Sequence, residues 1–263
     1  MNAYDGFLRM ATLRWRLILR QKAGWLGFSL CAVCVFLSLI FARASYLAPE
    51  RIFWDFSLGS CFVVVISLAI YLGSQLFADE QHRRTLHLVL SSGVSRGAWL
   101  HGNVCGIWLN LLGLTAIWWG LTGLTSWVIF HDVPAEISFQ VQWALIFEVL
   151  IVLWGTVAIS LCVRPLLAMA ASASGVFFLH SLSSLERIFS DPESGHLMRS
   201  SGIQSILSAA RWAPQLEWFD LRVFIGYEAS FPWSNLLTLT TLGLLWALLF
   251  SVLGSLRFER MDL

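Results

Sequence analysis

Charged side chains are scarce in this sequence. Only 13% of the 263 residues are Asp, Glu, Lys or Arg, and 57% are hydrophobic, whereas a soluble globular protein has about 25% charged residues. The scarcity argues against an ordinary water-soluble fold and predicts a chain that lies in lipid. The net charge is only +1, so no basic field favours nucleic acid as a partner.

Several chemical signatures are also missing. The chain has no Gly-x-x-x-x-Gly-Lys-Ser/Thr phosphate loop, and it lacks the His-Glu-x-x-His pattern of membrane-embedded metalloproteases. Its five cysteines lie in apolar stretches. Cys31 and Cys34 form a Cys-x-x-Cys pair with no His or acidic residue nearby, so helix packing is expected in preference to a metal or redox role. We expect no metal site, no cofactor and no catalytic residue on this chain.

What the sequence does have is a series of long apolar runs. A bilayer core of ~30 Å needs roughly 20 apolar residues of helix. Six runs meet or approach this length, near residues 24–42, 56–78, 99–130, 139–163, 166–181 and 233–256. The expected fold class is an all-α integral membrane protein with six transmembrane helices, in a single transmembrane domain over residues 1–263. The fifth run is the shortest, so its placement is the weakest.

The distribution of Lys and Arg predicts the orientation. Eleven of the 17 fall on the side that holds residues 1–23, and six fall on the other side. By the positive-inside rule, both termini are then cytoplasmic. Residues 1–23 hold five basic side chains, and we expect this segment to be retained as an anchor at the cytoplasmic face and not cleaved as a signal peptide. The predicted location is the bacterial cytoplasmic (inner) membrane.

Two segments outside the spans have helical patterns. Residues 3–22 combine an apolar face with basic side chains, which predicts an interfacial amphipathic helix; a solvated basic tail is the alternative. The outer segment 182–232 is too long for a plain connection. Apolar residues at helical spacing over 203–210, followed by an aromatic stretch, predict one or two short helices at the outer membrane surface, interrupted at Pro214.

The stretch 79–97, between the second and third spans, has a charged start and an apolar face. The residues that make up these two parts are Glu80, Arg83, Arg84, Thr85, Leu86, Val89, Leu90 and Ser91. Glu80 and Arg84 form an i,i+4 pair that supports a short helix. Gly93 is expected to break this helix, and Ser95 to cap the span that follows. Such a helix is suited to docking by another protein; a plain connector on the membrane is the alternative.

The same stretch resembles the signature of type-2 ABC exporter permeases. The resemblance rests on an acidic residue, a basic pair, Thr-Leu, a leucine run and a Ser-x-Val-Ser-Arg element before the next span: Glu80, Arg83, Arg84, Thr85, Leu86, Leu88, Leu90, Ser91, Ser92, Val94, Ser95, Arg96, Leu100 and Gly102. The layout of the whole chain is similar as well. Three positions depart from the pattern: Arg84 stands where the family usually has Gly, Gly93 where it often has Pro, and Asn103 where Lys commonly follows.

The resemblance implies a division of labour between subunits. In that family the stretch is a coupling helix in a cleft of a separate nucleotide-binding ATPase subunit, which alone binds ATP and Mg, and two permeases work with two ATPases. The implied partners are the ATPase subunit, a second copy of this chain or a homologous permease, and membrane lipid, with room for an accessory periplasmic protein. Glu80, Arg83 and Arg84 are then candidates for polar contacts, and Leu86 and Leu90 for buried anchors.

Inside the spans, Glu148 is the one acidic residue far from a helix end. A charge there costs ~2.5–3.5 kcal/mol, so we expect it in a substrate path or a dimer interface. The alternative is a protonated carboxyl that hydrogen-bonds through Gln142 or Thr156. Four glycines form a stripe in the third span: Gly102, Gly106, Gly113 and Gly120. Helix packing is expected of this stripe, with a conduit lining as the alternative.

Two functions are left to weigh. The first is the transmembrane subunit of an ATP-driven exporter. The second, an ion-coupled secondary transporter or a channel without an ATPase, would favour several buried charges and inverted halves. The sequence has one buried acid and no internal repeat, which favours the first. Lipid-linked, peptide and drug cargoes all remain open.

Overall fold

A computed structural model describes residues 3–20, 22–46, 48–83, 93–190, 212–226 and 231–261 of the chain. These residues form helices and connections, with no strand among them. The helices are α1 (Ala3–Arg20), α2 (Lys22–Ala44), α3 (Pro49–Arg83), α5 (Arg96–Phe130), α6 (Ala135–Ser160), α7 (Pro165–Ser190), η1 (Leu216–Phe219), α9 (Arg222–Gly226) and α10 (Trp233–Glu259). The expectation of an all-helical fold is confirmed for these parts of the chain.

Six helices are long and apolar enough to cross a membrane. Their candidate spans are Gly24–Ala44, Pro49–Ala78, Arg96–Phe130, Ala135–Ser160, Pro165–Leu182 and Trp233–Glu259. All six predicted spans are therefore present, and the chain has the fold of a multi-pass membrane protein. The ends of the helices differ from the apolar runs, because a helix continues through polar residues once its backbone bonds are set. The fifth helix shows this best, since α7 runs eight residues past Leu182.

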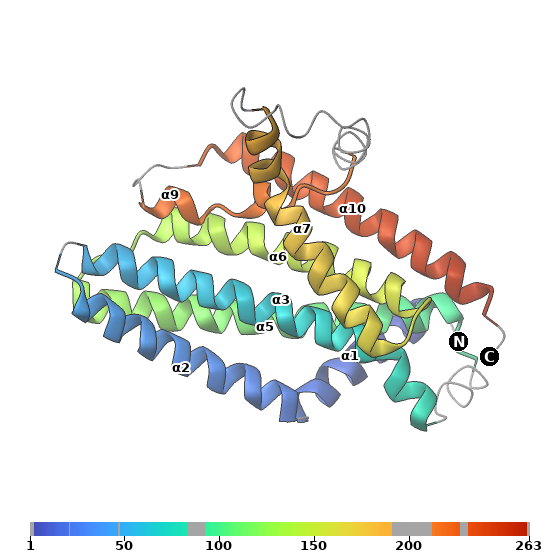
Figure 1. Cartoon of the computed structure of the whole chain (residues 1–263). Helices are drawn as coiled ribbons and strands as arrows, with labels where there is room; N and C mark the ends of the chain where they lie inside the picture. Colours follow the sequence, from blue (N-terminus) through green and yellow to red (C-terminus); the bar gives the residue numbers. More distant parts are fainter. Residues whose placement is uncertain are drawn as a thin grey trace.

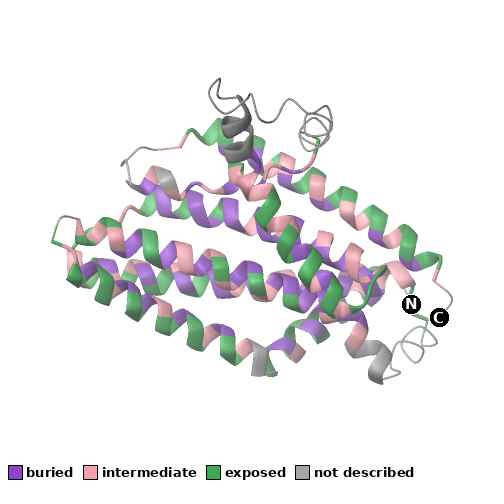
Figure 2. Ribbon diagram, in the orientation of Figure 1, coloured by how far each residue is buried: buried purple, intermediate pink, exposed green. Residues whose placement is uncertain are grey.

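The helices lie roughly side by side, with both termini at one end of the bundle (Figure 1). Helices α3, α5 and α6 contact one another and form the centre, while α2 packs on α3 and α10 packs on α6. Buried residues follow these central helices, and exposed residues dominate α2, α7 and α10 (Figure 2). In the membrane-spanning window of α6, 61% of the residues are buried, against 17% in that of α7. Helix α7 is thus the least anchored of the spans.

Helix α1 lies against the first part of α5 because two glycines remove side-chain bulk. A Cβ built on Gly102 would lie 2.7 Å from Met10 Cβ, and one on Gly106 would lie 2.6 Å from the carbonyl oxygen of Ala11. At Gly113 and Gly120, by contrast, nothing lies within 4 Å of the same position. Within the described chain only the first half of the glycine stripe therefore serves helix packing, since α1 does not extend along the second half.

At the end of the bundle opposite the termini, buried polar groups join α3 to α5. The indole N–H of Trp54 donates to Ser126 at 3.1 Å, and that of Trp118 donates to Ser57 at 3.2 Å. The hydroxyls of Ser57 and Thr122 are 2.7 Å apart. In lipid, apolar contacts give little preference for another helix over lipid, so hydrogen bonds of this kind help to hold two helices together.

The segment after α7 returns to the bundle. The short helices predicted near 203–210 lie outside the described residues. Beyond Pro214, η1 and α9 bury Leu216, Phe219 and Ile225 and contact α6 and α7 or α3. The part of this segment beyond Pro214 is therefore packed on the helical bundle, and its placement at the outer membrane surface stays a prediction.

Candidate functional site

Glu148 and His180 meet in the interior of the bundle. Glu148 is near the middle of α6, and His180 lies on α7, with its Nε2 atom 2.6 Å from Glu148 Oε1. The Glu148 side chain is fully buried, and that of His180 is 20% exposed. Each residue is about four turns of helix from the α6–α7 connection, which brings the two side chains to the same depth. Glu148 thus has an imidazole partner, which lowers the cost of a carboxyl group in lipid.

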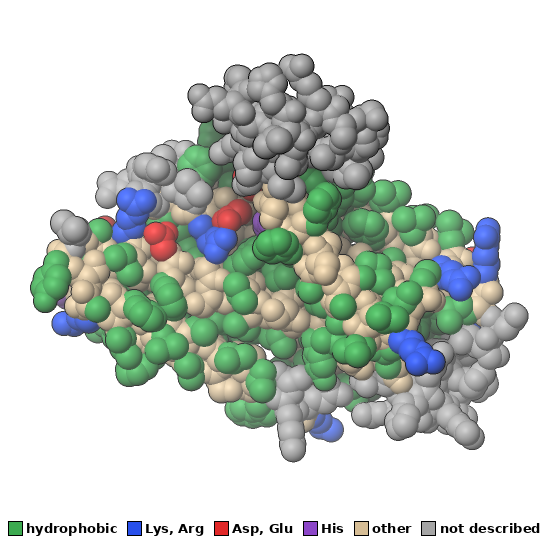
Figure 3. Space-filling model, in the orientation of Figure 1, with side chains coloured by type: hydrophobic (Ala, Val, Ile, Leu, Met, Phe, Trp, Pro, Cys, Tyr) green, Lys and Arg blue, Asp and Glu red, His purple; other side chains and the backbone are tan. Residues whose placement is uncertain are grey.

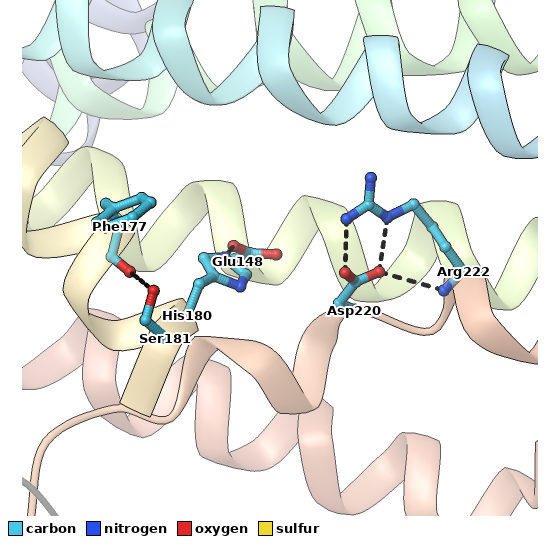
Figure 4. A network of polar contacts seen from close by, with 6 residues as sticks. All are labelled: Glu148, Phe177, His180, Ser181, Asp220 and Arg222. Atoms are coloured by element: carbon cyan, nitrogen blue, oxygen red, sulfur yellow. Dashed lines mark hydrogen bonds and ion pairs between the residues drawn. The ribbon is translucent and has the colours of Figure 1, made fainter. Parts of the chain in front are cut away.

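A second polar pair lies beside the first (Figure 4). Asp220 and Arg222 flank the start of α9, and the Arg222 side chain donates two hydrogen bonds to the carboxylate, from Nε at 2.6 Å and from Nη2 at 2.5 Å. Burial by itself would raise the pKa of Asp220, but the hydrogen bonds and charge of Arg222 outweigh it and hold that pKa below its usual value. The same hydrogen bonds raise the pKa of Arg222, so both groups are charged.

Phe62 of α3 connects the two pairs. Its ring packs edge-on against the His180 imidazole with centroids 5.2 Å apart, and the Arg222 guanidinium lies over the same ring at 4.8 Å from its centroid. Phe62 thus links the residues on α6 and α7 to Asp220 and Arg222, which lie just before and at the start of α9. We call Glu148, His180, Asp220 and Arg222 the polar cluster.

The second carboxylate oxygen of Glu148 has no hydrogen-bond partner among the described residues. Figure 4 shows it pointing toward the Asp220–Arg222 pair, and it is fully buried. Neither partner considered from the sequence reaches Glu148: the Gln142 amide lies 3.9 Å from Cys61 Sγ, and the buried Thr156 hydroxyl makes no hydrogen bond within the described chain. Hydrogen bonding through Gln142 or Thr156 is therefore replaced by hydrogen bonding to His180. A buried acceptor of this kind favours a donor or a cation.

Two cavities flank α7. One, of about 510 Å³, lies between α3 and α7 and ends at His180, Asp220 and Arg222. The other, of about 470 Å³, lies among α6, α7 and α10 and is lined almost entirely by apolar side chains. Both volumes fall within the ~300–1,000 Å³ of small-molecule sites. Helix α7 thus has space on two sides, which agrees with its low burial.

The structure describes only the margins of the predicted coupling stretch. Glu80 and Arg83 belong to the last turn of α3, while Arg84, Thr85, Leu86, Val89, Leu90 and Ser91 lie outside the described residues. At the far margin the predicted Ser95 cap is confirmed, whereas the helix that Gly93 is expected to break lies outside the described residues. Gly93 has a positive φ of 85°, which glycine adopts readily, and the Ser95 side chain caps α5 by accepting from the Ala98 N–H at 3.2 Å.

Three members of the polar cluster were missed from the sequence alone. His180 lies at the end of the apolar run 166–181, where no role is expected from the sequence, whereas the helix continues to Ser190. Asp220 and Arg222 stand two apart in an aromatic segment, and such spacing alone does not predict a buried pair. In the part of the chain that the structure describes, no group of three or more His, Cys, Asp or Glu side chains could hold a metal ion.

The geometry allows two kinds of chemistry. The Glu148–His180 pair can hold or exchange a proton, and the carboxylates can stabilise a cation in a low-dielectric setting. Comparison of the chain with protein-family models and with characterised proteins found no match to either.

Proposed function

We propose that this chain is the transmembrane permease subunit of an ATP-binding cassette transporter of the exporter type. It lies in the bacterial inner membrane with both termini in the cytoplasm and works as a pair of permeases with two separate ATPase subunits. The observation that carries the proposal is the stretch 80–96, whose residues resemble the coupling segment of type-2 exporter permeases. The absence of a phosphate loop from the sequence agrees with ATP hydrolysis on a partner.

The structure around this stretch supports the proposal because the helix ends next to it are packed tightly against one another. Helices α3 and α5, each of 35 residues, begin or end beside it. The rings of Phe77, Trp99 and Phe258 form a buried triangle with centroids 5.4 Å apart. These contacts join the ends of α3, α5 and α10. Movement of the coupling segment would therefore be transmitted to three membrane-spanning helices.

Arg96 also holds the start of α5 and the end of α10 together. Its Nη1 atom donates to the carbonyl oxygens of Phe258, Glu259 and Met261 at 3.3, 2.9 and 2.9 Å. The last carbonyls of a helix have no partner within the helix, and here a side chain from α5 supplies one. This cap ties α10 to the start of α5, next to the proposed docking segment.

Co-purification tests the docking. The full chain is expressed with a tag in its native membranes, and the ATPase subunit that co-purifies with it is identified and its recovery measured. Leu86→Asp should abolish recovery, because it places a charge on the proposed apolar anchor. Val163→Asp makes the same change in the α6–α7 connection, where Val163 is 40% exposed, and should leave recovery intact. Normal ATPase recovery with Leu86→Asp in the membrane would refute the docking.

The polar cluster favours a second candidate. A carboxylate and an imidazole that meet inside the membrane are typical of proton-coupled transport, which would make the chain a secondary transporter with no ATPase. The two candidates differ in energy source. Uptake into proteoliposomes of the purified chain alone, driven by a pH gradient, would favour the second, whereas dependence on the ATPase and ATP would favour the first.

A further inference from the structure

The apolar cavity among α6, α7 and α10, of about 470 Å³, is a groove that runs along three helices. Its lining residues recur at helical spacing within 151–162 of α6, 171–179 of α7 and 250–257 of α10, so each helix contributes one continuous face. Leu253, in the α10 wall, is 50% exposed and belongs to a membrane span. The groove therefore opens toward lipid.

The groove has the depth of one leaflet of a bilayer. Residues 151–162 of α6 cover about 16 Å at the helical rise of 1.5 Å per residue, which is about half of the ~30 Å hydrocarbon core. One end of the groove lies at Cys162 and Arg257, each within two residues of the end of its span, at Ser160 and Glu259. The groove thus reaches from the depth of the lipid headgroups to the middle of the membrane, as a single acyl chain does.

A single cation lies at the headgroup end of the groove. Among the described residues that line it, Arg257 alone is charged, and its guanidinium has no ion pair within the described chain. Glu259 is two residues further along α10, and side chains two apart on a helix do not face each other. Figure 3 shows Lys and Arg side chains at the edge of a largely hydrophobic face, at the end that holds the termini. An anionic headgroup at this depth would be attracted.

Two glycines keep the groove open. A Cβ built on Gly175 of α7 would meet nothing within 4 Å, and one on Gly155 of α6 would meet only the Phe250 ring, at 3.8 Å. Glycine weakens a helix relative to alanine. At Gly102 and Gly106 its small size admits another helix, whereas no helix of the described chain takes the space beside Gly175. That space suits a slender apolar group from outside the chain.

We propose that this groove binds one acyl chain of an anionic membrane phospholipid, whose phosphate pairs with Arg257. The planar guanidinium suits this role because its N–H groups match the oxygens of a phosphate. The chain lies along Gly155 and Gly175, and the lipid comes from the leaflet on the side of the termini. That this leaflet is the cytoplasmic one rests on the proposed function and its orientation, whereas the binding itself needs no ATPase.

Two phospholipids with the same chains test the role of charge. Dioleoyl phosphatidylglycerol has an anionic headgroup, and dioleoyl phosphatidylcholine has a headgroup without net charge. Binding of each to the purified full-length protein in detergent is measured by native mass spectrometry, which resolves successive bound lipids. We expect the first phosphatidylglycerol to bind about fivefold more tightly than the first phosphatidylcholine, since one arginine near the headgroup contributes about this factor. Equal affinities would overturn the proposal.

A matched pair of variants locates the headgroup. Arg257→Gln should weaken phosphatidylglycerol binding about fivefold and leave phosphatidylcholine binding unchanged. Arg260→Gln makes the same change at an exposed residue about one turn further on, which does not line the groove, and should leave the binding of both lipids unchanged. Equal losses of phosphatidylglycerol binding in the two variants would show a general attraction to the basic end of the bundle, and would overturn the site.

A second pair locates the acyl chain. Gly175→Phe fills part of the groove and should abolish the tight phosphatidylglycerol site. Gly120→Phe adds the same ring on α5, where a Cβ also meets nothing within 4 Å, and should leave the site intact. Tight binding that survives Gly175→Phe would overturn the groove as its location, and Arg257→Gln keeps the test valid if Gly175→Phe does not fold. Co-purification with Leu86→Asp is independent of these assays, so failure of the lipid site leaves the permease proposal standing, and the reverse also holds.

Discussion

The packing of α1 on α5 gives a sharp test of the fold, because the glycine stripe divides into a packed and an open half. The double variant Gly102→Ala and Gly106→Ala adds two methyl groups against α1. The matched variant Gly113→Ala and Gly120→Ala adds two methyl groups to the same helix at positions where nothing lies within 4 Å. The two variants have the same composition and differ only in what the new atoms meet.

The expected magnitude follows from the contacts. At Gly106 the new Cβ would lie 2.6 Å from the Ala11 carbonyl oxygen and 2.8 Å from Arg14 Cβ, and at Gly102 it would lie 2.8 Å from the Phe7 carbonyl oxygen. Two of these three neighbours are backbone atoms, so α1 must shift as a whole. Overpacking of this kind costs roughly 1–3 kcal/mol per site. Alanine is a better helix former by about 1 kcal/mol, but that gain is common to both variants and cancels between them. We therefore expect a stability difference of about 2–6 kcal/mol between the two double variants.

Unfolding and proteolysis together measure this difference. Stability is compared by thermal unfolding in one detergent, and trypsin reports on α1 because Arg14 is only 4% exposed against α5. The packed-half variant should unfold at a lower temperature and be cleaved after Arg14 in the native state, while the open-half variant should match or exceed the wild type. Equal stability and equal cleavage in the two variants would refute the close approach of α1 to α5.

Two further changes test the polar contacts. Arg96→Gln removes the hydrogen bonds to the carbonyls at the end of α10 and should lower the unfolding free energy by about 1–3 kcal/mol; the exposed Arg260→Gln is its control, and equal effects of both in thermal unfolding would contradict the cap. Asp220→Asn should lower the melting temperature at pH 7. Because the folded pKa of Asp220 is depressed, its stabilisation is present above the unfolded pKa and is lost as pH falls through the folded value. Wild type and variant should therefore converge below about pH 4, and a constant difference in melting temperature would contradict the pairing with Arg222.

The spans could be predicted from the sequence because their signal is local. An apolar run of the right length has one stable solution in lipid, a helix, and each of the six runs forms one. The Ser95 cap was predictable for the same reason, since a helix cap depends on the residue and its close neighbours. The predicted ends were less accurate. Pro49 begins α3 seven residues before its apolar run, as proline does readily at the first position of a helix.

The polar cluster could not be predicted because it depends on long-range contacts. Glu148 could be found as a lone acid in an apolar run, but its partner lies 32 residues away on a helix whose tilt is set by neighbouring helices. Asp220 and Arg222 reach the cluster only because the segment after α7 folds back on the bundle. The glycine stripe shows the same limit. Its spacing indicates a smooth helix face, while the place where α1 ends decides which glycines are covered.

The polar cluster and the two cavities together explain how so poorly buried a helix keeps one orientation. Lipid is as apolar as the helix surface, so burial gives α7 little preference for a particular rotation. Rotating it by one residue, about 100°, would move His180 away from Glu148 and leave a buried carboxyl without its partner. The hydrogen bond between Glu148 and His180 therefore favours one rotation of α7, while cavities lie on two sides of the helix.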